Sequence, residues 1–242
     1  MHYAVSDIHG CYKEFKKLME EVIGFTENDI LYVIGDVVDR GPDPIGILNW
    51  MMKRPNVYGI FGNHEYMMLK VLEPGLKEIN SEEEIENTLT LDYLVDTNIW
   101  FWGENGGRVT ADAFRQLPEY ERQDLLDYVK DFSLYESVEI DGRTFVMVHT
   151  IDDSIKSLRD LEDKEITDVE SFLTSRPTFD GKWDQKDIFI IGHTPTWFLG
   201  KRDCTIFRNG NLINIDCGCS MRGKLAAVCL ETGDVYYVSC DK

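Results

Sequence analysis

Six short apolar runs along the chain have the composition of β-strands, and each is followed within two residues by a polar side chain of a metal-binding type. The runs are 3–5, 30–34, 57–61, 145–148, 188–191 and 212–215. The polar residues that follow them are Asp7, Asp36, Asn63, His149, His193 and Asp216. Ligands of α/β sheets bind beyond the carboxyl ends of the strands. The pattern therefore predicts a cluster of carboxylate, amide and imidazole groups along one rim.

The segments between the early strands have the spacing of helices. Residues 13–25 carry apolar side chains at helical intervals and reach a stop signal at Gly24, and 44–52 follows a turn. The second half of the chain is rich in hairpin signals instead. These turns are Asp141-Gly142, Asn209-Gly210 and Thr232-Gly233-Asp234. We expect an α/β protein in which two packed mixed β-sheets, the second more meander than βαβ, are flanked by helices.

A long helical segment separates the third and fourth strands. It covers about 73–135, where Ser81 with Glu84 matches a capping box and Pro118 opens a further helix. No repeat or Pro/Ser-rich linker divides the chain. We therefore expect a single domain, 1–242, with a helical insertion at about 73–135.

The net charge of −19, from 25 Lys and Arg against 44 Asp and Glu, changes the range of partners. Such a chain repels phosphate backbones, which disfavours binding to nucleic acid or to anionic membranes through basic patches. Of the acidic residues, 18 lie between Glu73 and Asp141, against 5 basic ones. The acidity is thus concentrated around the predicted insertion, and it does not exclude a phosphorylated substrate at the rim.

Compartment and redox state follow from the apolar runs and the cysteines. The N-terminus lacks the basic start and apolar core of a signal peptide, and no apolar run approaches 18 residues. We expect a cytoplasmic protein. Six cysteines are few for this length and lie mostly in apolar runs, so reduced thiols are expected rather than disulfides.

The rim residues have both structural and chemical explanations. Taken singly, Asp7 could cap a helix, Asp36 to Arg40 could form a turn with a surface ion pair, and His149 and His193 could be half-buried. Taken together, however, they favour a metal-binding or catalytic role, because four of the five histidines stand at or just beyond predicted strand ends.

Oxygen and imidazole ligands suit Mn, Fe, Zn or Mg, and six ligating positions exceed what one tetrahedral ion needs. Two divalent ions about 3.5–4 Å apart clamp a phosphoryl group. The neighbouring Arg40 offers a planar fork for phosphate, so we expect phosphate-ester hydrolysis.

The motifs as a set resemble those of the calcineurin-like metallophosphoesterases, and more narrowly the bacterial and phage serine/threonine protein phosphatases. They are Asp7-Ile8-His9-Gly10, Gly35-Asp36-Val37-Val38-Asp39-Arg40-Gly41, Gly62-Asn63-His64-Glu65, His149 and Gly192-His193-Thr194. The resemblance spans nearly the whole chain and implies the four-layer αββα fold of that family. It implies two divalent ions, with manganese expected first.

The resemblance also implies a role for each rim residue. Asp7, His9 and Asp36 would hold one metal, with Asp36 bridging to a second that is completed by Asn63, His149 and His193. His64 would be the general acid, oriented by Asp39, and Arg40 would bind phosphate oxygens together with Asn63. A hydroxide bridging the two ions would attack phosphorus in line, without a phosphoenzyme intermediate.

Four positions depart from the family pattern. Thr150-Ile151 follows His149 where a small residue and glycine are usual, and Cys217 replaces a commoner threonine. Residues 173–179 resemble the segment that carries a second phosphate-binding arginine, Arg176, although Thr174 stands where an aromatic residue is expected. The segment 102–107 resembles a loop near the substrate mouth and receives no role.

Three functions remain open at the level of sequence. A serine/threonine protein phosphatase is the first expectation, with a phosphorylated protein or peptide as substrate. The alternative is a bis(5'-nucleosyl)-tetraphosphatase, with a nucleotide substrate. We expect the symmetrical enzymes of that class to have a non-acidic residue in place of Asp39 and Asp in place of Glu65, so the sequence leans away from them. A non-catalytic binding module on the same scaffold is the third.

Overall fold

The computed structural model of the chain describes residues 1–78, 97–183 and 186–240, and its first sheet carries the N-terminal motifs. The strand order is β10-β9-β1-β2-β3. The strands are β1 (His2–Ser6), β2 (Ile30–Ile34), β3 (Val57–Ile60), β9 (Lys224–Cys229) and β10 (Val235–Ser239). Strands β1, β2 and β3 are parallel, while β9 and β10 are antiparallel to their neighbours. The carboxyl ends of β1 to β3 therefore share one edge.

The second sheet has the order β4-β5-β6-β8-β7. Its strands are β4 (Tyr135–Ile140), β5 (Arg143–Val148), β6 (Ile188–Ile191), β7 (Phe207–Asn209) and β8 (Leu212–Asn214). The three expected hairpins are present as β4–β5, β7–β8 and β9–β10. The expected meander is wrong for the centre of this sheet, however, because β5, β6 and β8 pair in parallel. That parallel pairing brings the carboxyl ends of β5, β6 and β8 to one edge as well.

The helices match the apolar periodicity. They are α1 (Tyr12–Lys16), η1 (Lys17–Ile23), α2 (Pro44–Met52), α3 (Asn63–Glu78), α5 (Thr97–Trp102), η3 (Gly103–Gly107), α6 (Arg108–Arg115), α7 (Glu119–Lys130), α8 (Leu158–Glu162), α9 (Val169–Leu173), η4 (Thr196–Leu199) and η5 (Cys219–Met221). Helix η1, which continues α1, ends at Gly24, whose φ of 71° is favourable for glycine. Helix α7 begins after Pro118, as expected. The predicted capping box of Ser81 and Glu84 lies outside the described residues.

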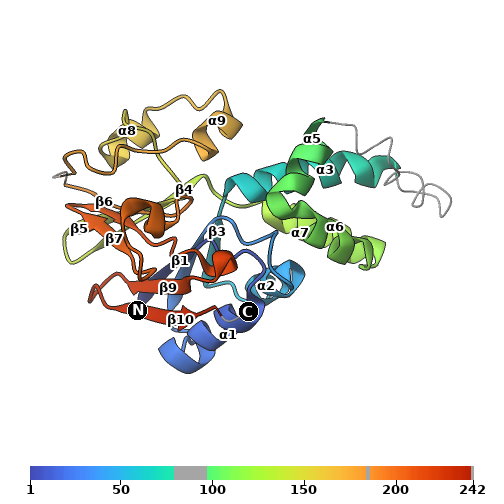
Figure 1. Cartoon of the computed structure of the whole chain (residues 1–242), viewed down its shortest axis with the longest axis horizontal. Helices are drawn as coiled ribbons and strands as arrows, with labels where there is room; N and C mark the ends of the chain where they lie inside the picture. The colour runs from blue at the N-terminus through green and yellow to red at the C-terminus, as the bar shows by residue number, and fades with distance from the viewer. Residues whose placement is uncertain (79–96, 184–185, 241–242) are drawn as a thin grey trace.

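Three apolar cores separate four layers, which confirms the expected αββα architecture. Ile34 and Ile60 of the first sheet pack with Met147 and Ile190 of the second between the two sheets. A second core joins the outer face of the first sheet to the helices α1, α2, α3 and α7, and a third joins the outer face of the second sheet to α8 and α9. In Figure 1, α3, α5, α6 and α7 gather on one side of the sheets, away from α8 and α9. That the segment of about 73–135 is an insertion remains a prediction.

One cysteine pair corrects the expectation of reduced thiols. Cys219 and Cys240 form a disulfide, whereas Cys11, Cys204, Cys217 and Cys229 are free. The pairing joins η5 to the segment after β10, two elements that the sheet brings together although 21 positions separate them. Among the described helices, none is long and apolar enough to cross a membrane.

Candidate metal centre and phosphate-binding site

The strand ends bring the predicted rim residues together on strained backbone. Positive φ angles, which are unfavourable for residues other than glycine, occur at Asp7 (50°), His9 (46°), Asp36 (53°) and His193 (67°). Such conformations cost about 1–3 kcal/mol each and persist only where the surrounding structure enforces them. Strain concentrated at the ends of β1, β2 and β6 marks this edge as a functional site.

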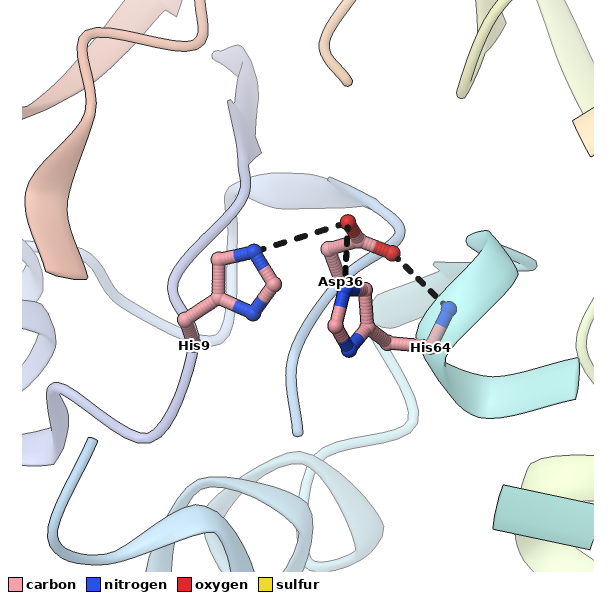
Figure 2. Close-up of side chains that lie close together, drawn as sticks. All are labelled: His9, Asp36 and His64. Atoms are coloured by element: carbon pink, nitrogen blue, oxygen red, sulfur yellow. Dashed lines mark hydrogen bonds and ion pairs between the residues drawn. The ribbon is translucent and has the colours of Figure 1, made fainter. Parts of the chain in front are cut away.

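Asp36 lies at the centre of the cluster and is 2% exposed. Its Oδ2 is 3.5 Å from His9 Nε2 and 3.9 Å from His64 Nε2, as Figure 2 shows, and its Oδ1 is 3.5 Å from His149 Nε2. The backbone N–H of His64 also donates to Oδ1 at 3.1 Å. One oxygen of the Asp36 carboxylate therefore faces the imidazoles of His9 and His64, and the other oxygen faces that of His149.

Asn63, His149 and His193 form the second of these groups. The side-chain oxygen of Asn63 is 3.1 Å from His149 Nε2 and 3.0 Å from His193 Nδ1, and these two nitrogens are 3.2 Å apart. With Asp36, the two histidines have ligand atoms within 4.8 Å of one another, a spacing suited to one ion. This arrangement brings together all the residues that the sequence predicted for the second metal.

The first group differs from the prediction in one member. Its ligand atoms within 4.8 Å come from His9, Asp36 and His64, and among the described residues Asp7 belongs to neither group. The carboxylate of Asp7 instead accepts the backbone N–H of His193, at 3.1 Å to each oxygen. A Cβ on Gly192 would lie 2.0 Å from Asp7 Oδ2, so only glycine permits this approach. Asp7 is thus next to the cluster, and its role as a ligand remains a prediction.

The protonation states of the cluster fit divalent cations. Burial lowers the pKa of His9, of His149 and, to about 3, of His193, so these imidazoles are neutral and can ligate. Burial raises the pKa of Asp7, with repulsion from Asp216 and Asp36 adding to it, and burial raises that of Asp216 to about 7. A bound cation would relieve this repulsion. The nitrogen of His193 that faces this group is Nδ1, which lies close to Asn63 and His149.

His64, a member of the first group, is a second kind of histidine. His64 Nδ1 is 2.6 Å from Asp39 Oδ2, and Asp39 is fully buried. Burial by itself would lower the pKa of His64, but attraction to Asp36 and the hydrogen bond to Asp39 outweigh burial and raise it. His64 therefore keeps a proton at higher pH than an ordinary histidine, as a general acid requires.

Arg40 extends from the same turn across the mouth of the first group. Its Nη1 donates to His9 Nε2 at 2.7 Å and its Nη2 donates to His64 Nε2 at 2.9 Å. Its backbone N–H donates to Gly106 O at 3.1 Å, and its Nε donates to Asn105 O at 3.5 Å. The guanidinium is thus held at the reacting edge, where a phosphate oxygen could replace the imidazoles as acceptor of its planar donors.

A cavity of about 300 Å³ opens over these groups. Asp36, Asn63 and His64 line it together with the predicted phosphate-binding pair, Arg40 and Arg176. The structure therefore brings Arg176 to the same site although Thr174 departs from the family pattern.

Comparison with known proteins agrees with this geometry. The sequence profile of the calcineurin-like phosphoesterase family matches residues 3–216. The chain belongs to this family. It is a metallophosphoesterase, and its two ligand groups are the places where divalent ions can bind.

Relatives with assigned functions are dinucleoside tetraphosphatases. The symmetrical bis(5'-nucleosyl)-tetraphosphatase of Cellvibrio japonicus is 24% identical over 275 residues, which cover 99% of this chain and 98% of the relative. The enzyme of the same name from Wigglesworthia glossinidia brevipalpis is 37% identical over 89 residues, but this match spans 36% of the chain and only 32% of the relative.

Solved structures with the same fold come from two functional classes. A protein given the provisional name diadenosine tetraphosphatase has a TM-score of 0.63 at 17% identity, with 98% of this chain and 92% of that one covered. A serine/threonine phosphatase from Saccharomyces cerevisiae has a TM-score of 0.55 at 14% identity, with 100% and 80% covered. At such identities these two likenesses establish the fold alone.

Glu65 is a site residue that the sequence analysis used only as a family marker. Its carboxylate accepts the backbone N–H groups of Asp36 and Val37, both at 2.8 Å, and of Gly62 at 3.0 Å. It therefore ties the loops after β2 and β3 of this phosphoesterase to each other. The signal that the sequence offered was an acidic residue directly after Asn63 and His64.

Trp102 and Thr110 are further residues that the sequence left without a role. Trp102 Nε1 donates to Asp39 Oδ2 at 2.8 Å, and Thr110 Oγ1 donates to Asp39 Oδ1 at 2.6 Å. Thr110 Oγ1 also accepts the Asp39 backbone N–H at 2.9 Å. The helical segment after β3 therefore holds the Asp39 carboxylate in place, and Asp39 in turn orients His64. The spacing of these residues in the sequence does not reveal this contact.

Thr150, noted as a departure from the family pattern, also has a structural role. Its Oγ1 donates to Ser175 O at 2.7 Å. This bond attaches the segment that carries Arg176 to the end of β5, directly after His149.

Proposed function

We propose that this phosphoesterase hydrolyses dinucleoside tetraphosphates into two nucleoside diphosphates. The observation that carries the proposal is the Asp36-centred ligand cluster opening into a cavity lined by Arg40 and Arg176. The substrate class is supported by the tetraphosphatase of Cellvibrio japonicus, which matches this chain along nearly its whole length. Water adds to one of the two central phosphorus atoms, and the central P–O–P bond breaks with its oxygen leaving on the other half.

When bound, two divalent ions would neutralise charge on the phosphate and would activate water as a nucleophile at neutral pH. Asp36, His9, His149, His193 and Asn63 are the side chains that would hold them, with Asp7 as the predicted further ligand. Manganese is the ion we expect first, because oxygen and imidazole donors suit it, and the same donors also accept Fe, Zn or Mg.

The phosphate chain is oriented by the arginines. Arg40 and Arg176 offer planar donors to the phosphate oxygens, and these interactions strengthen as negative charge shifts toward the leaving group. A phosphate that draws Arg40 onto its own oxygens also releases His64 Nε2, which Arg40 otherwise contacts at 2.9 Å. Substrate binding thus leaves the imidazole free to carry the proton.

His64 donates that proton to the departing oxygen. Asp39 accepts from Nδ1, which fixes the tautomer and ring orientation and favours the charged form. General acid catalysis of this kind contributes about 10²- to 10⁴-fold to turnover.

A phosphoserine or phosphothreonine residue is the second candidate substrate. The observation that favours it is the buried Asp39–His64 pair, because an alkoxide is a poorer leaving group than a phosphate and depends more on a proton donor. Asp39 and Glu65 were also the residues that made a protein phosphatase the first expectation from sequence.

A substrate panel separates these candidates. Purified protein would be assayed with Mn, Zn, Fe and Mg against a dinucleoside tetraphosphate and a phosphoserine peptide, with product identification. We expect nucleoside diphosphates as the products and a kcat/KM at least about tenfold above that for the peptide, a difference of about 1.4 kcal/mol. Faster peptide dephosphorylation would replace the proposal with the second candidate. Absence of turnover on both, with metal bound, would favour the binding module.

A further inference from the structure

Three apolar side chains are exposed around the cavity that contains the reacting groups. Phe198 is 73% exposed, Phe101 45% and Met221 37%, and all three line the cavity together with Arg40 and Arg176. Phenylalanine is normally among the most buried residues, and exposed apolar groups gathered at one cavity indicate a binding surface. The lining therefore combines the buried ligand groups with two exposed arginines and three exposed apolar side chains.

Phe198 is anchored to the element that follows the ligand residue His193. It lies on η4, where its backbone N–H donates to Pro195 O at 2.9 Å. The N–H of Thr196 donates to Asp216 O at 2.8 Å, which fixes the helix to the end of β8. The ring packs edge-to-face with Trp197, at 5.5 Å between centroids and 86° between planes. Phe198 is thus an exposed ring on a well-attached support.

Phe101 is anchored to the general-acid pair from a different part of the chain. It lies on α5, on the helical side of the molecule in Figure 1, and the next residue, Trp102, donates to Asp39. Its carbonyl oxygen accepts from Asn105 Nδ2 at 2.8 Å, and Asn105 O in turn accepts from Arg40 Nε. The backbone that carries this ring is therefore linked through Asn105 to the phosphate-binding Arg40.

We propose that Phe198 and Phe101 are stacking platforms for the two nucleobases of the substrate. The inference rests on the proposed function and specifies how that site selects a dinucleoside over inorganic polyphosphate. A dinucleoside tetraphosphate has a charged chain between two flat rings, which matches a cavity lined by two arginines and two exposed aromatic rings. Stacking of a base on an aromatic side chain is tolerant of base identity, so either purines or pyrimidines can occupy the platforms.

Inhibition of a reporter reaction tests the platforms independently of tetraphosphate cleavage. Hydrolysis of p-nitrophenyl phosphate by the metal-loaded enzyme would be inhibited with a dinucleoside tetraphosphate and with inorganic tripolyphosphate, and the two inhibition constants compared as a ratio. We expect Phe198→Ala or Phe101→Ala to weaken the dinucleoside relative to tripolyphosphate by about 5- to 150-fold per ring. Phe198→Trp keeps a stacking surface and should restore the ratio.

Tyr120→Ala is the matched control, because Tyr120 is an exposed aromatic residue of α7 that does not line this cavity. It should leave both inhibition constants unchanged. Because the two phenylalanines are largely exposed, their replacement spares the apolar cores.

The outcomes separate the platforms from the proposed function. A Phe-dependent ratio in an enzyme that binds but does not cleave the dinucleoside supports the platforms and overturns the proposed function. Cleavage of the dinucleoside with an unchanged ratio in both alanine variants overturns the platforms alone. Loss of affinity for a phosphopeptide, without loss for the dinucleoside, would also overturn the platforms. The rings would then bind apolar side chains that flank the phosphorylated residue of a peptide.

Discussion

Two adjoining regions of the site contain the same residue type in opposite states. In the metal-type cluster the pKa values of His9, His149 and His193 lie below the ordinary value, whereas the pKa of His64 in the acid pair lies above it. All four side chains are largely buried, and burial lowers the pKa of each. Burial therefore does not explain the difference.

For His9 and His149, the partner of the second ring nitrogen explains it. His9 Nδ1 is 2.9 Å from Val38 O and His149 Nδ1 is 3.1 Å from Ile34 O. A carbonyl oxygen can only accept, so Nδ1 carries the hydrogen and Nε2 keeps a lone pair for a ligand. His64 Nδ1 faces the carboxylate of Asp39 instead, and that charge stabilises the imidazolium. A neutral partner thus gives a metal ligand, and a charged partner gives an acid.

Asp36→Asn is the change with the largest expected effect, because it removes the negative charge that both ligand groups share. We expect both ions to be lost and turnover to fall by about 10³-fold or more, since the charge stabilisation supplied by metal ions is worth several kcal/mol. Elemental analysis of the purified variant measures the metal content. Full occupancy in Asp36→Asn would contradict the shared-carboxylate arrangement.

His64→Asn separates the two regions. We expect kcat to fall by about 10²- to 10⁴-fold while metal content stays at the wild-type level, because the acid is lost and the remaining ligands are intact. In His9→Asn, by contrast, loss of metal content should be the primary effect. His2→Asn is the matched control, since His2 pairs with Glu231 away from the site. Loss of both ions in His64→Asn would show that His64 is a metal ligand, and His64 would then not differ in role from the other histidines.

Asp39→Asn should lower the pKa of His64, so that His64 resembles the histidines of the metal-type cluster. Without the carboxylate the raised pKa of His64 falls, so the protonated form, and with it activity, is lost at lower pH than in the wild type. We also expect kcat at neutral pH to fall by about 10- to 100-fold, as for other residues that orient a catalytic group. The pH dependence of kcat measures both effects. An alkaline limb that does not move would show that Asp39 has no influence on the acid.

Trp102→Phe gives the smallest expected effect. It removes one of the hydrogen bonds to Asp39 while the bond from Thr110 remains, so we expect a 2- to 12-fold fall in kcat, which corresponds to about 0.5–1.5 kcal/mol. Trp100→Phe is the control, because Trp100 lies on the same helix and is largely exposed. Equal effects of the two substitutions would remove Trp102 from the support of the acid.

The ligand cluster could be predicted because it follows from strand order. Asp36, Asn63, His149 and His193 each follow a strand, and parallel strands place their carboxyl ends at one edge. The hairpin turns and α2 were predictable for a similar reason, since they depend on residues close together in the chain.

Contacts between distant segments were not predictable in this way. Trp102 reaches Asp39 across 63 positions, and Glu65 joins two loops that precede it. The disulfide of Cys219 and Cys240 was predicted wrongly because its formation depends on how η5 and the segment after β10 are placed. Burial of a given tryptophan, glutamate or cysteine follows no periodic pattern when its partner belongs to another element.

The sequence by itself determined which chemical groups stand at the strand ends, and with them the family and the class of reaction. Only the tertiary structure decided what each group does. Four histidines look alike in the sequence, but a pKa depends on desolvation and on charges a few ångströms away, and these come from other elements of the fold. His64 differs from His9 and His149 because the fold brings the Asp39 carboxylate to 2.6 Å from its Nδ1, whereas the Nδ1 atoms of the other two face backbone carbonyls.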